Sequence, residues 1–283
     1  GRTNLYLFFI AKAVSHLKNG GELVFIVPRD MIKLTAARKL NSLLFRLGTI
    51  THWIETGDQK IFDGAVPNCA IFRFELGNKS RKTKFKSLGE KVWHERVFTE
   101  MDGQIAFLEK GMSVPLSSLF YVKVGAVSGA DPLFSHPEGN VEFVCSKTIE
   151  TGETRRMLYN VRHPALEGHK ERLLQRRIRA FTDDNWWSWG RGYHESESPR
   201  IYVNGKTRKV KPFFTHKCRA YDGSVLALFP KNPNMNLEKA IDLLNRRVPW
   251  DQLGFVVDGR FIFSQRSLQT VILPDDFRDL FER

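Results

Sequence analysis

A short apolar run at residues 23–27 (LVFIV) constrains the fold more than any other feature of this sequence. Because the run is continuous rather than alternating, and Pro28 ends it, it predicts a strand covered on both faces, as in a parallel sheet. The flanking segments carry apolar residues at helical spacing, and two further apolar runs follow. The predicted elements are helices at residues 3–18 and 36–47 and strands at 50–55 and 69–74.

This order of helix, strand, helix, strand and strand is that of the closing half of a doubly wound α/β sheet. A nucleotide-binding sheet usually opens with a strand and a glycine-rich turn, whereas this sequence starts directly with a helix. We therefore expect the given sequence to begin inside a larger domain.

A polar, lysine-rich stretch at residues 78–91 predicts a linker at the edge of this domain. Beyond it, short strand-like runs and a helix at residues 237–247 are typical of an α+β domain. The sequence thus predicts three parts. They are half of a doubly wound sheet at residues 1–78, a linker with connecting strands at 79–115, and an α+β domain at 116–283.

The net charge of +13 and the pI of about 9.7 favour a polyanionic partner, with nucleic acid ahead of a membrane surface. Most of the excess lies in the second half, where residues 155–219 hold sixteen Lys or Arg and six Asp or Glu, a balance of +10. No run of 18 apolar residues is present, so no membrane span is expected. A basic but otherwise ordinary protein is the alternative.

The three cysteines lie far apart and form no CxxC pair, which fits a reducing compartment and offers no zinc spacing. His163 and His169 are six residues apart, which matches no metal-binding spacing, so no metal site is predicted. The sequence also lacks a Walker motif, GxGxxG, HExxH and GxSxG. Residues 232–235 (NPNM) are similar to the Asn-Pro-Pro-aromatic tetrapeptide of amino-methylating enzymes. We interpret them as a decoy, because Asn and Met replace its last two residues.

Several residues of the second half are candidates for contact with nucleic acid. Gly125 and Gly129 interrupt an apolar strand pattern, where they permit close approach of a partner or simply form a turn. Three tryptophans among residues 186–189 lie beside arginines, and they can stack on bases or form a structural knot. Each candidate has a solvated or structural role as its alternative. The candidates are Lys123, Gly125, Gly129, Arg177, Trp187, Trp189, Arg191, Arg208 and Lys209.

The stretch at residues 54–74 places Phe62 on a connector beside Asp63 and Gly64, shortly before the predicted strand at 69–74. A Phe on a loop at the edge of a sheet can be a platform for a planar ligand. It can equally be a plug in the core, since most Phe residues are buried. Spacing alone leaves both roles open.

In their order along the chain, these pieces resemble the C-terminal part of TaqI-like, gamma-class adenine-specific DNA methyltransferases of restriction-modification systems. Residues 5–21 are similar to a helix of the form LYxxFxxxAxxxLKxGG, and residues 21–28 to a strand of the form GxLxFIVP. Residues 61–74 are similar to the motif whose Phe stacks on the flipped adenine. Residues 116–134 and 186–273 resemble the family's target-recognition domain.

The resemblance implies that Phe62 stacks on the extruded adenine and that residues 116–283 read double-stranded DNA. It also implies S-adenosylmethionine as the methyl donor, a bacterial cytoplasmic location, and a restriction endonuclease subunit or domain as a partner. The family's cofactor motif and its Asn-Pro-Pro-Tyr tetrapeptide are absent, so no catalytic or cofactor-binding residue is assigned.

We therefore expect the chain alone to be inactive until the missing N-terminal part of the catalytic domain completes it. A non-catalytic DNA-binding specificity subunit of a restriction-modification complex is the first alternative to this enzyme. An RNA-binding protein is the second.

Overall fold

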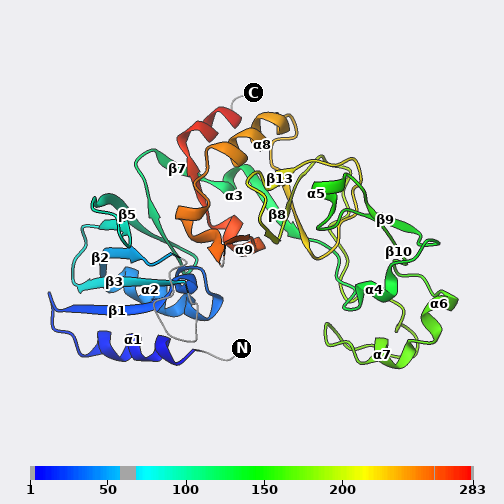
Figure 1. Cartoon of the computed structure of the whole chain (residues 1–283), viewed down its shortest axis with the longest axis horizontal. Helices are drawn as coiled ribbons and strands as arrows, with labels where there is room; N and C mark the ends of the chain where they lie inside the picture. The colour runs from blue at the N-terminus through cyan, green and yellow to red at the C-terminus, as the bar shows by residue number, and fades with distance from the viewer. Residues whose placement is uncertain (1–3, 58–67, 258, 282–283) are drawn as a thin grey trace. The chain divides into compact units, whose positions relative to one another are not determined.

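The chain divides into two compact units in the computed structural model, which describes residues 4–57, 68–257 and 259–281 (Figure 1). Two segments near the C-terminal end belong to the N-terminal unit rather than to the α+β domain in which we expected them. Unit 1 comprises Gly1–Leu116, Val248–Ile262 and Thr270–Arg278, and unit 2 comprises Ser117–Arg247, Phe263–Gln269 and Asp279–Arg283.

Unit 1 is built on a six-stranded sheet with the strand order β1-β3-β2-β4-β5-β6. The strands β1 and β2 point the same way, but β3 lies antiparallel between them, and β2 pairs with β4 in parallel. The predicted α/β fold is thus confirmed, with a mixed sheet. The strands are β1 (Glu22–Pro28), β2 (Gly48–Glu55), β3 (Cys69–Leu76), β4 (Lys82–Ser87), β5 (His94–Met101) and β6 (Gln104–Leu108).

Only one face of β1 is covered, which corrects the expectation for residues 23–27. Its side chains alternate between buried and exposed, and Val24 and Ile26 are 63% and 44% exposed. The other face shares one core with α1 (Leu5–Ser15) and α2 (Arg38–Leu47), which match the predicted helices. Among its members are the fully buried rings of Trp53, Phe72 and Phe74.

The lysine-rich stretch at residues 78–91 is not a linker, because β4 lies inside the sheet between β2 and β5. Thr83 and Phe85 are buried, whereas the lysines that flank Thr83 are exposed. This alternation has the period of a strand with one face in the core. The lysines therefore form the solvent face of a strand.

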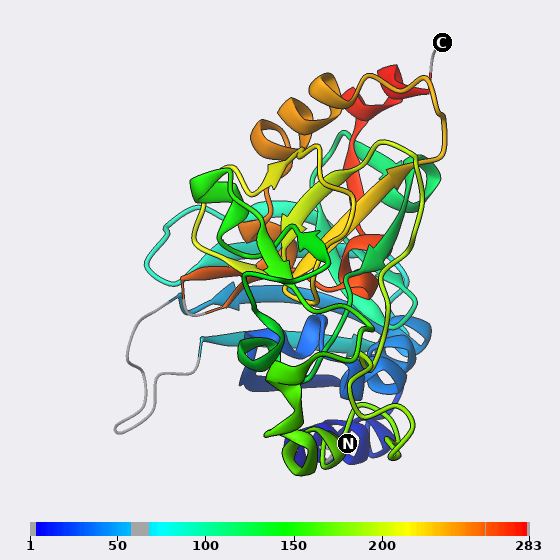
Figure 2. The same ribbon diagram turned by 90° about the vertical axis from the view of Figure 1, so that its right-hand side faces the viewer.

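The C-terminal segments return to unit 1 as short strands and turns. β17, red in Figures 1 and 2, pairs with β7, and β15 pairs antiparallel with β16. The strands are β7 (Met112–Pro115), β15 (Val256–Val257), β16 (Arg260–Ile262) and β17 (Ile272–Pro274), and the C-terminal helical turns are Asp251–Phe255 and Asp275–Leu280. Two further helical turns, Arg29–Ile32 and Thr35–Ala37, lie between β1 and α2.

Unit 2 holds a four-stranded antiparallel sheet with the order β13-β11-β14-β8. The sheet strands are β8 (Phe120–Val124), β11 (Ile201–Asn204), β13 (Phe213–Phe214) and β14 (Val225–Pro230). The other strands are β9 (Val141–Phe143), β10 (Arg155–Met157) and β12 (Lys206–Thr207). The helices are α3 (Leu116–Leu119), α4 (Asp131–Phe134), α5 (Thr148–Thr151), α6 (Pro164–Glu167), α7 (Lys170–Leu174), α8 (Leu237–Arg246) and α9 (Gln265–Gln269).

Unit 2 contains little regular structure outside its sheet. In the basic segment 171–180 the helix α7 ends at Leu174, and residues 131–134 form the short helix α4. Asn204 and Gly205 do not turn a hairpin, because β11 pairs with β13 and β14. Of the helices that the structure describes, none combines the length and the apolarity needed to cross a bilayer.

Asn41 of α2 is fully buried, and its amide Nδ2 donates hydrogen bonds to the carbonyls of Met31 (3.1 Å) and Gly103 (2.9 Å). Because Asn41→Ala leaves these buried acceptors without a donor, we expect unfolding to become easier by about 1–3 kcal/mol. Urea denaturation followed by circular dichroism measures this loss. Lys39→Ala, at an exposed position of the same helix, is the control. Equal stability of the two variants would show that the amide bonds do not hold α2 in place.

Candidate functional site

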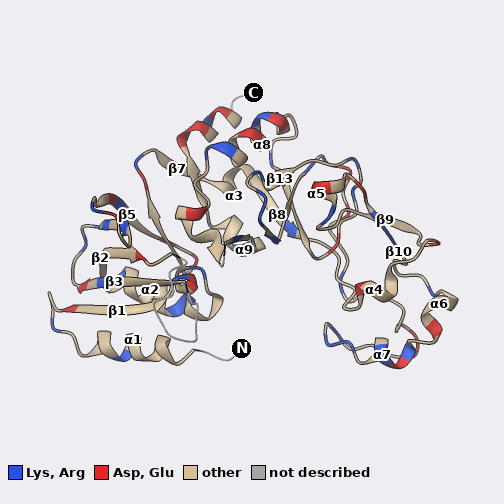
Figure 3. Ribbon diagram, in the orientation of Figure 1, with Lys and Arg blue, Asp and Glu red and all other residues tan. Residues whose placement is uncertain are grey.

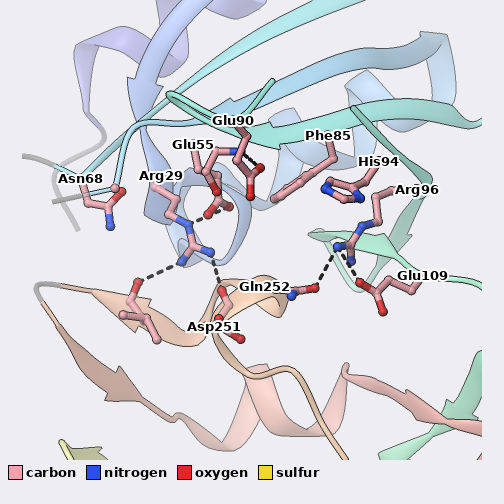
Figure 4. Close-up of a pocket in the computed structure, with 13 residues that line it drawn as sticks. Arg29, Glu55, Asn68, Phe85, Glu90, His94, Arg96, Glu109, Asp251 and Gln252 are labelled. Atoms are coloured by element: carbon pink, nitrogen blue, oxygen red, sulfur yellow. Dashed lines mark hydrogen bonds and ion pairs between the residues drawn. The ribbon is translucent and has the colours of Figure 1, made fainter. Parts of the chain in front are cut away.

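Unit 1 contains a polar cavity of about 470 Å³ at the carboxyl ends of β1 and β2 (Figure 4). In open α/β sheets, ligands bind outside the carboxyl ends of the strands. The wall is dominated by charged side chains rather than by apolar ones. Its lining residues are Arg29, Glu55, Gly57, Asn68, Phe85, Ser87, Glu90, His94, Arg96, Glu109, Asp251, Gln252 and Val256.

Arg29 is the centre of this cavity. It follows the proline that ends β1, and its guanidinium lies against segment 251–256 in Figure 4. Nε lies 2.8 Å from a carboxylate oxygen of Glu55, while Nη1 donates to the carbonyl of Val256 (3.0 Å) and Nη2 to that of Asp251. Arg29 is 5% exposed, so its charge is compensated almost entirely by protein groups.

A second buried arginine lies at the other side of the cavity. Arg96 of β5 places Nη2 2.6 Å from the carboxylate of Glu109 and 2.8 Å from Oε1 of Gln252. Burial lowers the pKa of Arg96, and the neighbouring carboxylates, Glu109 first, oppose that effect. Both arginines therefore join the N-terminal sheet to the segment that returns from residue 248.

The loop that links β2 to β3 begins and ends at this cavity. Thr56 donates its N–H (3.0 Å) and its hydroxyl (2.9 Å) to the carbonyl of Cys69, and the N–H of Cys69 donates back to the hydroxyl (3.0 Å). The backbone N–H of Arg29 donates to the carbonyl of Asn68 (2.8 Å). Phe62 lies within this loop and outside the described residues, so the structure leaves its role a prediction.

Lys33 lies beside the same segment, with Nζ 5.3 Å from the ring centre of Phe255. Burial, and then the charge of Arg29, lower the pKa of Lys33 to about 8. Its ammonium group is therefore less stable in the folded chain than in water.

The two predicted glycines of unit 2 make room for the protein itself. A Cβ at Gly125 would lie 2.0 Å from the carbonyl oxygen of Asp222, and one at Gly129 would lie 2.5 Å from Cδ1 of Ile178. Gly129 also has a positive φ of 76°, which side chains disfavour. Internal packing accounts for both glycines without a bound partner.

The tryptophans divide between core and surface. Trp189 is buried, stacks on Phe143 with a centroid distance of 5.0 Å, and donates its indole N–H to the carbonyl of Leu158 (2.8 Å). This favours its structural alternative. Trp187 is half-buried, and the guanidinium of Arg162 lies 5.6 Å from its ring centre.

The five predicted cationic contacts lie on several different segments of unit 2. Arg177, Arg191 and Arg208 are exposed, and Lys123 is half-buried on β8. Lys209 is exposed and lies 3.3 Å from a carboxylate oxygen of Glu150. Their contact with DNA remains a prediction.

Three arginines that were not among the predicted site residues, Arg29, Arg96 and Arg176, are buried and bind several protein groups. Arginine is usually exposed, and none of the three lies in a motif. The one available signal was the place of Arg29, directly after a strand-ending proline at the carboxyl edge of the sheet.

One group of side chains in unit 2 has the composition of a metal site. The ligand atoms of His136, Glu138 and His163 lie within 4.8 Å of one another. However, Nδ1 of each histidine accepts a backbone N–H at 3.2 Å, which places the proton of a neutral ring on Nε2. Histidine ligands of metals have the opposite arrangement, donating the second ring N–H outward. We therefore assign the group to hydrogen bonding, with Nε2 of His163 3.1 Å from Glu138.

Parts of the chain are similar to known proteins. The model of the Eco57I restriction-modification methylases matches residues 1–62. The type II methyltransferase M.TthHB8I of Thermus thermophilus is 31% identical over 140 residues, 45% of this chain and 32% of that protein. M.AccI of Acinetobacter calcoaceticus is 25% identical over 89 residues, 31% of this chain and 16% of that protein.

The fold is similar to that of the type IIL restriction-modification enzyme MmeI, solved in complex with DNA. The TM-score is 0.60 at 12% identity, over 92% of this chain and 40% of that one. At this identity the likeness shows the fold alone. Residues 1–62 match the Eco57I methylase model, and the chain spans about a third or less of the curated relatives that it matches.

A double-mutant cycle tests the ion pair of Arg29. Arg29→Met leaves the carboxylate of Glu55 without its cation, so we expect a loss of about 3–5 kcal/mol in unfolding free energy. In Arg29→Met/Glu55→Gln the loss should be smaller than the sum of the two single losses. The exposed pair Arg162–Glu167, with the same N–O distance of 2.8 Å, is the control and should show much weaker coupling. Additive losses at Arg29 and Glu55 would contradict a functional ion pair.

The lowered pKa of Lys33 predicts a pH dependence of stability. Between about pH 8, where the folded group loses its proton, and about pH 10.4, where the unfolded group does, the unfolded state binds more protons. The free energy of unfolding should therefore rise with pH in this window, relative to Lys33→Met. Urea denaturation at a series of pH values measures this free energy. If it depends on pH in the same way in the wild type and in Lys33→Met, the ammonium group lies in water.

Proposed function

We propose that this chain is the C-terminal part of a site-specific DNA adenine-N6 methyltransferase. Unit 1 contributes to its catalytic domain, and unit 2 contacts double-stranded DNA. The similarity to methyltransferases carries the proposal: residues 1–62 match the Eco57I methylase model, and M.TthHB8I is 31% identical over 140 residues. β1, β2 and Arg29, which form part of the cavity at the carboxyl edge of the sheet, belong to the matched segment.

The surface of unit 1 supports a further half of the catalytic domain as a partner. Within the described chain, β1 is the last strand of its sheet, so one of its edges is unpaired. Leu5, Phe8 and Phe9 of α1 are 68%, 60% and 59% exposed, and Val24 of β1 is 63% exposed. Exposed large apolar side chains of this kind are typical of an interaction site. The N-terminal part of the methyltransferase is its proposed occupant.

S-adenosylmethionine is the methyl donor in this proposal, but the cavity of unit 1 does not fit it. The arginines of the cavity are paired with its carboxylates, Arg29 with Glu55 and Arg96 with Glu109. Phe85 is 6% exposed and offers little ring surface to an adenine. We therefore assign the donor to the N-terminal part and derive no step through it.

The contribution of unit 1 to the reaction is to hold the base. The target amino group lies inside the duplex, so the adenine must leave the base stack before it can react. Phe62 stacks on the extruded adenine in this proposal. The hydrogen bonds between Thr56 and Cys69 fix both ends of the loop that carries it.

The contribution of unit 2 is electrostatic. It contains residues 155–219 with their balance of +10, and phosphate contacts provide most of the sequence-independent affinity for DNA. Lys123, Arg177 and Arg191 remain proposed contacts, as do Arg208, Lys209 and the half-buried Trp187. The enzyme would act in the bacterial cytoplasm beside a restriction endonuclease subunit or domain.

Phe62→Ala in the complete enzyme tests the proposed role of the loop. Loss of stacking worth roughly 1–3 kcal/mol should slow single-turnover methylation about 5- to 150-fold. The fluorescence of 2-aminopurine at the target position reports base extrusion independently. Phe281→Ala, which removes a ring that is 50% exposed, is the control. An unfolded Phe62→Ala protein would support a core plug instead, and an unchanged rate would remove Phe62 from the site.

The same assay separates the enzyme from a non-catalytic specificity subunit. Both would bind duplex DNA, but only the enzyme transfers a methyl group once the complete reading frame is expressed. A complete protein that binds DNA and methylates none would leave the specificity subunit as the function.

A further inference from the structure

Residues 175–181 (QRRIRAF) of unit 2 form a segment that directly follows α7, and we name it the arginine segment. It contains three arginines with two different environments. Arg176 is 8% exposed, whereas Arg177 and Arg179 are exposed. The buried member explains how the other two are held.

Arg176 ties the segment to the interior of unit 2 through four backbone carbonyls. Nε donates to Leu173 (2.8 Å), Nη1 to Ser128 (2.6 Å), and Nη2 to Trp186 (2.5 Å) and Ser188 (3.0 Å). Burial, and then Arg179, lower the pKa of Arg176 to about 10, so it stays protonated at neutral pH. The charge-assisted bonds connect α7, the glycine turn and the tryptophan stretch.

Ile178 provides a second attachment. A Cβ at Gly190 would lie 2.6 Å from Cγ2 of Ile178, and a Cβ at Gly129 would lie 2.5 Å from its Cδ1. The side chain therefore rests on two positions where only glycine leaves enough room. The segments that carry Gly129 and Gly190 are joined by a backbone hydrogen bond of 2.9 Å from the N–H of Val127 to the carbonyl of Arg191.

Phe181 closes the segment. Its ring centre lies 3.8 Å from the guanidinium carbon of Arg176 and 4.9 Å from that of Arg179. Stacking of a guanidinium on an aromatic ring restricts the conformations of the arginine but does not neutralise its charge. Arg179 is thereby oriented, although its charge stays open to solvent.

Arg177 and Arg179 lack a neutralising partner. Neither forms an ion pair with any residue that the structure describes, in contrast to Lys170 of α7, which lies 2.6 Å from Asp183. Figure 3 shows basic positions along the loop beside α7. Two unpaired guanidinium groups on an anchored backbone form a site for an anionic ligand.

We propose that the arginine segment is a preorganised clamp for the phosphate backbone of duplex DNA, with Arg177 and Arg179 as the contacts. Arg176, Ile178 and the two glycines are positioning residues. The inference rests on the proposed function, which makes DNA the polyanion. A backbone fixed before binding spares the entropy of ordering a loop, and guanidinium groups donate paired hydrogen bonds to phosphate.

Removal of the two contacts tests the clamp. The purified 283-residue chain binds a fluorescent duplex of random sequence between roughly 50 and 200 mM salt, and the slope of log K against log salt is measured. Arg177→Ala/Arg179→Ala should reduce the magnitude of this slope by about 2, one unit for each lost phosphate contact. Arg246→Ala/Lys239→Ala removes two exposed cations of α8 and should leave the slope unchanged.

A glycine substitution tests the positioning. Gly190→Ala should displace Ile178 and reduce the slope although both contact arginines are present. Gly168→Ala is the matched control, because a Cβ there meets no atom within 4 Å. An unchanged slope in the folded Gly190→Ala protein would overturn the positioning role.

The outcomes separate this inference from the proposed function. If the wild-type chain shows no salt-dependent binding to DNA, the proposed function of unit 2 fails. If the wild-type chain binds with a steep slope and Arg177→Ala/Arg179→Ala binds identically, the clamp is wrong while the proposed function stands.

Discussion

Unit 1 depends on the buried guanidinium of Arg29. A charge at this depth costs several kcal/mol unless it is paired and hydrogen-bonded, so its partners must stay in place. These partners are Glu55 at the end of β2 and two carbonyls of segment 251–256, one of which is 227 residues away in sequence. The same residue also holds Asn68 through its backbone. One residue therefore connects the ends of β1 and β2, Asn68 just before β3, and the returning segment.

A buried arginine also stabilises unit 2. Arg176 also donates to backbone carbonyls from a buried position, but it organises loops rather than strand ends. Around it lie short helices and turns, which provide few backbone hydrogen bonds of their own. Buried arginines can replace regular structure as the scaffold because each offers five donors in a rigid plane. The surface arginines beside Arg176 then lie on a fixed backbone.

The helices of the first 78 residues could be predicted from periodicity and the strands from their apolar runs, but the exposed face of β1 could not. β4 could not, because its alternating lysines have the appearance of a solvated charge run until Thr83 and Phe85 are known to be buried. The return of residues 248–262 to unit 1 depends on contacts with Arg29 and Arg96, and no local pattern encodes them. Of the candidate site residues, the concentration of positive charge in residues 155–219 was predictable. The burial of Trp189 was left open, since spacing does not distinguish a stacking ring from a core ring.

We propose that unit 1 completes an enzyme that methylates adenine at a defined DNA sequence. The decisive measurement is methylation-sensitive sequencing of genomic DNA after exposure to the complete protein and S-adenosylmethionine. We expect N6-methyladenine at one short recurring sequence. Methylation of cytosine, methylation without sequence preference, or no methylation would refute this proposal.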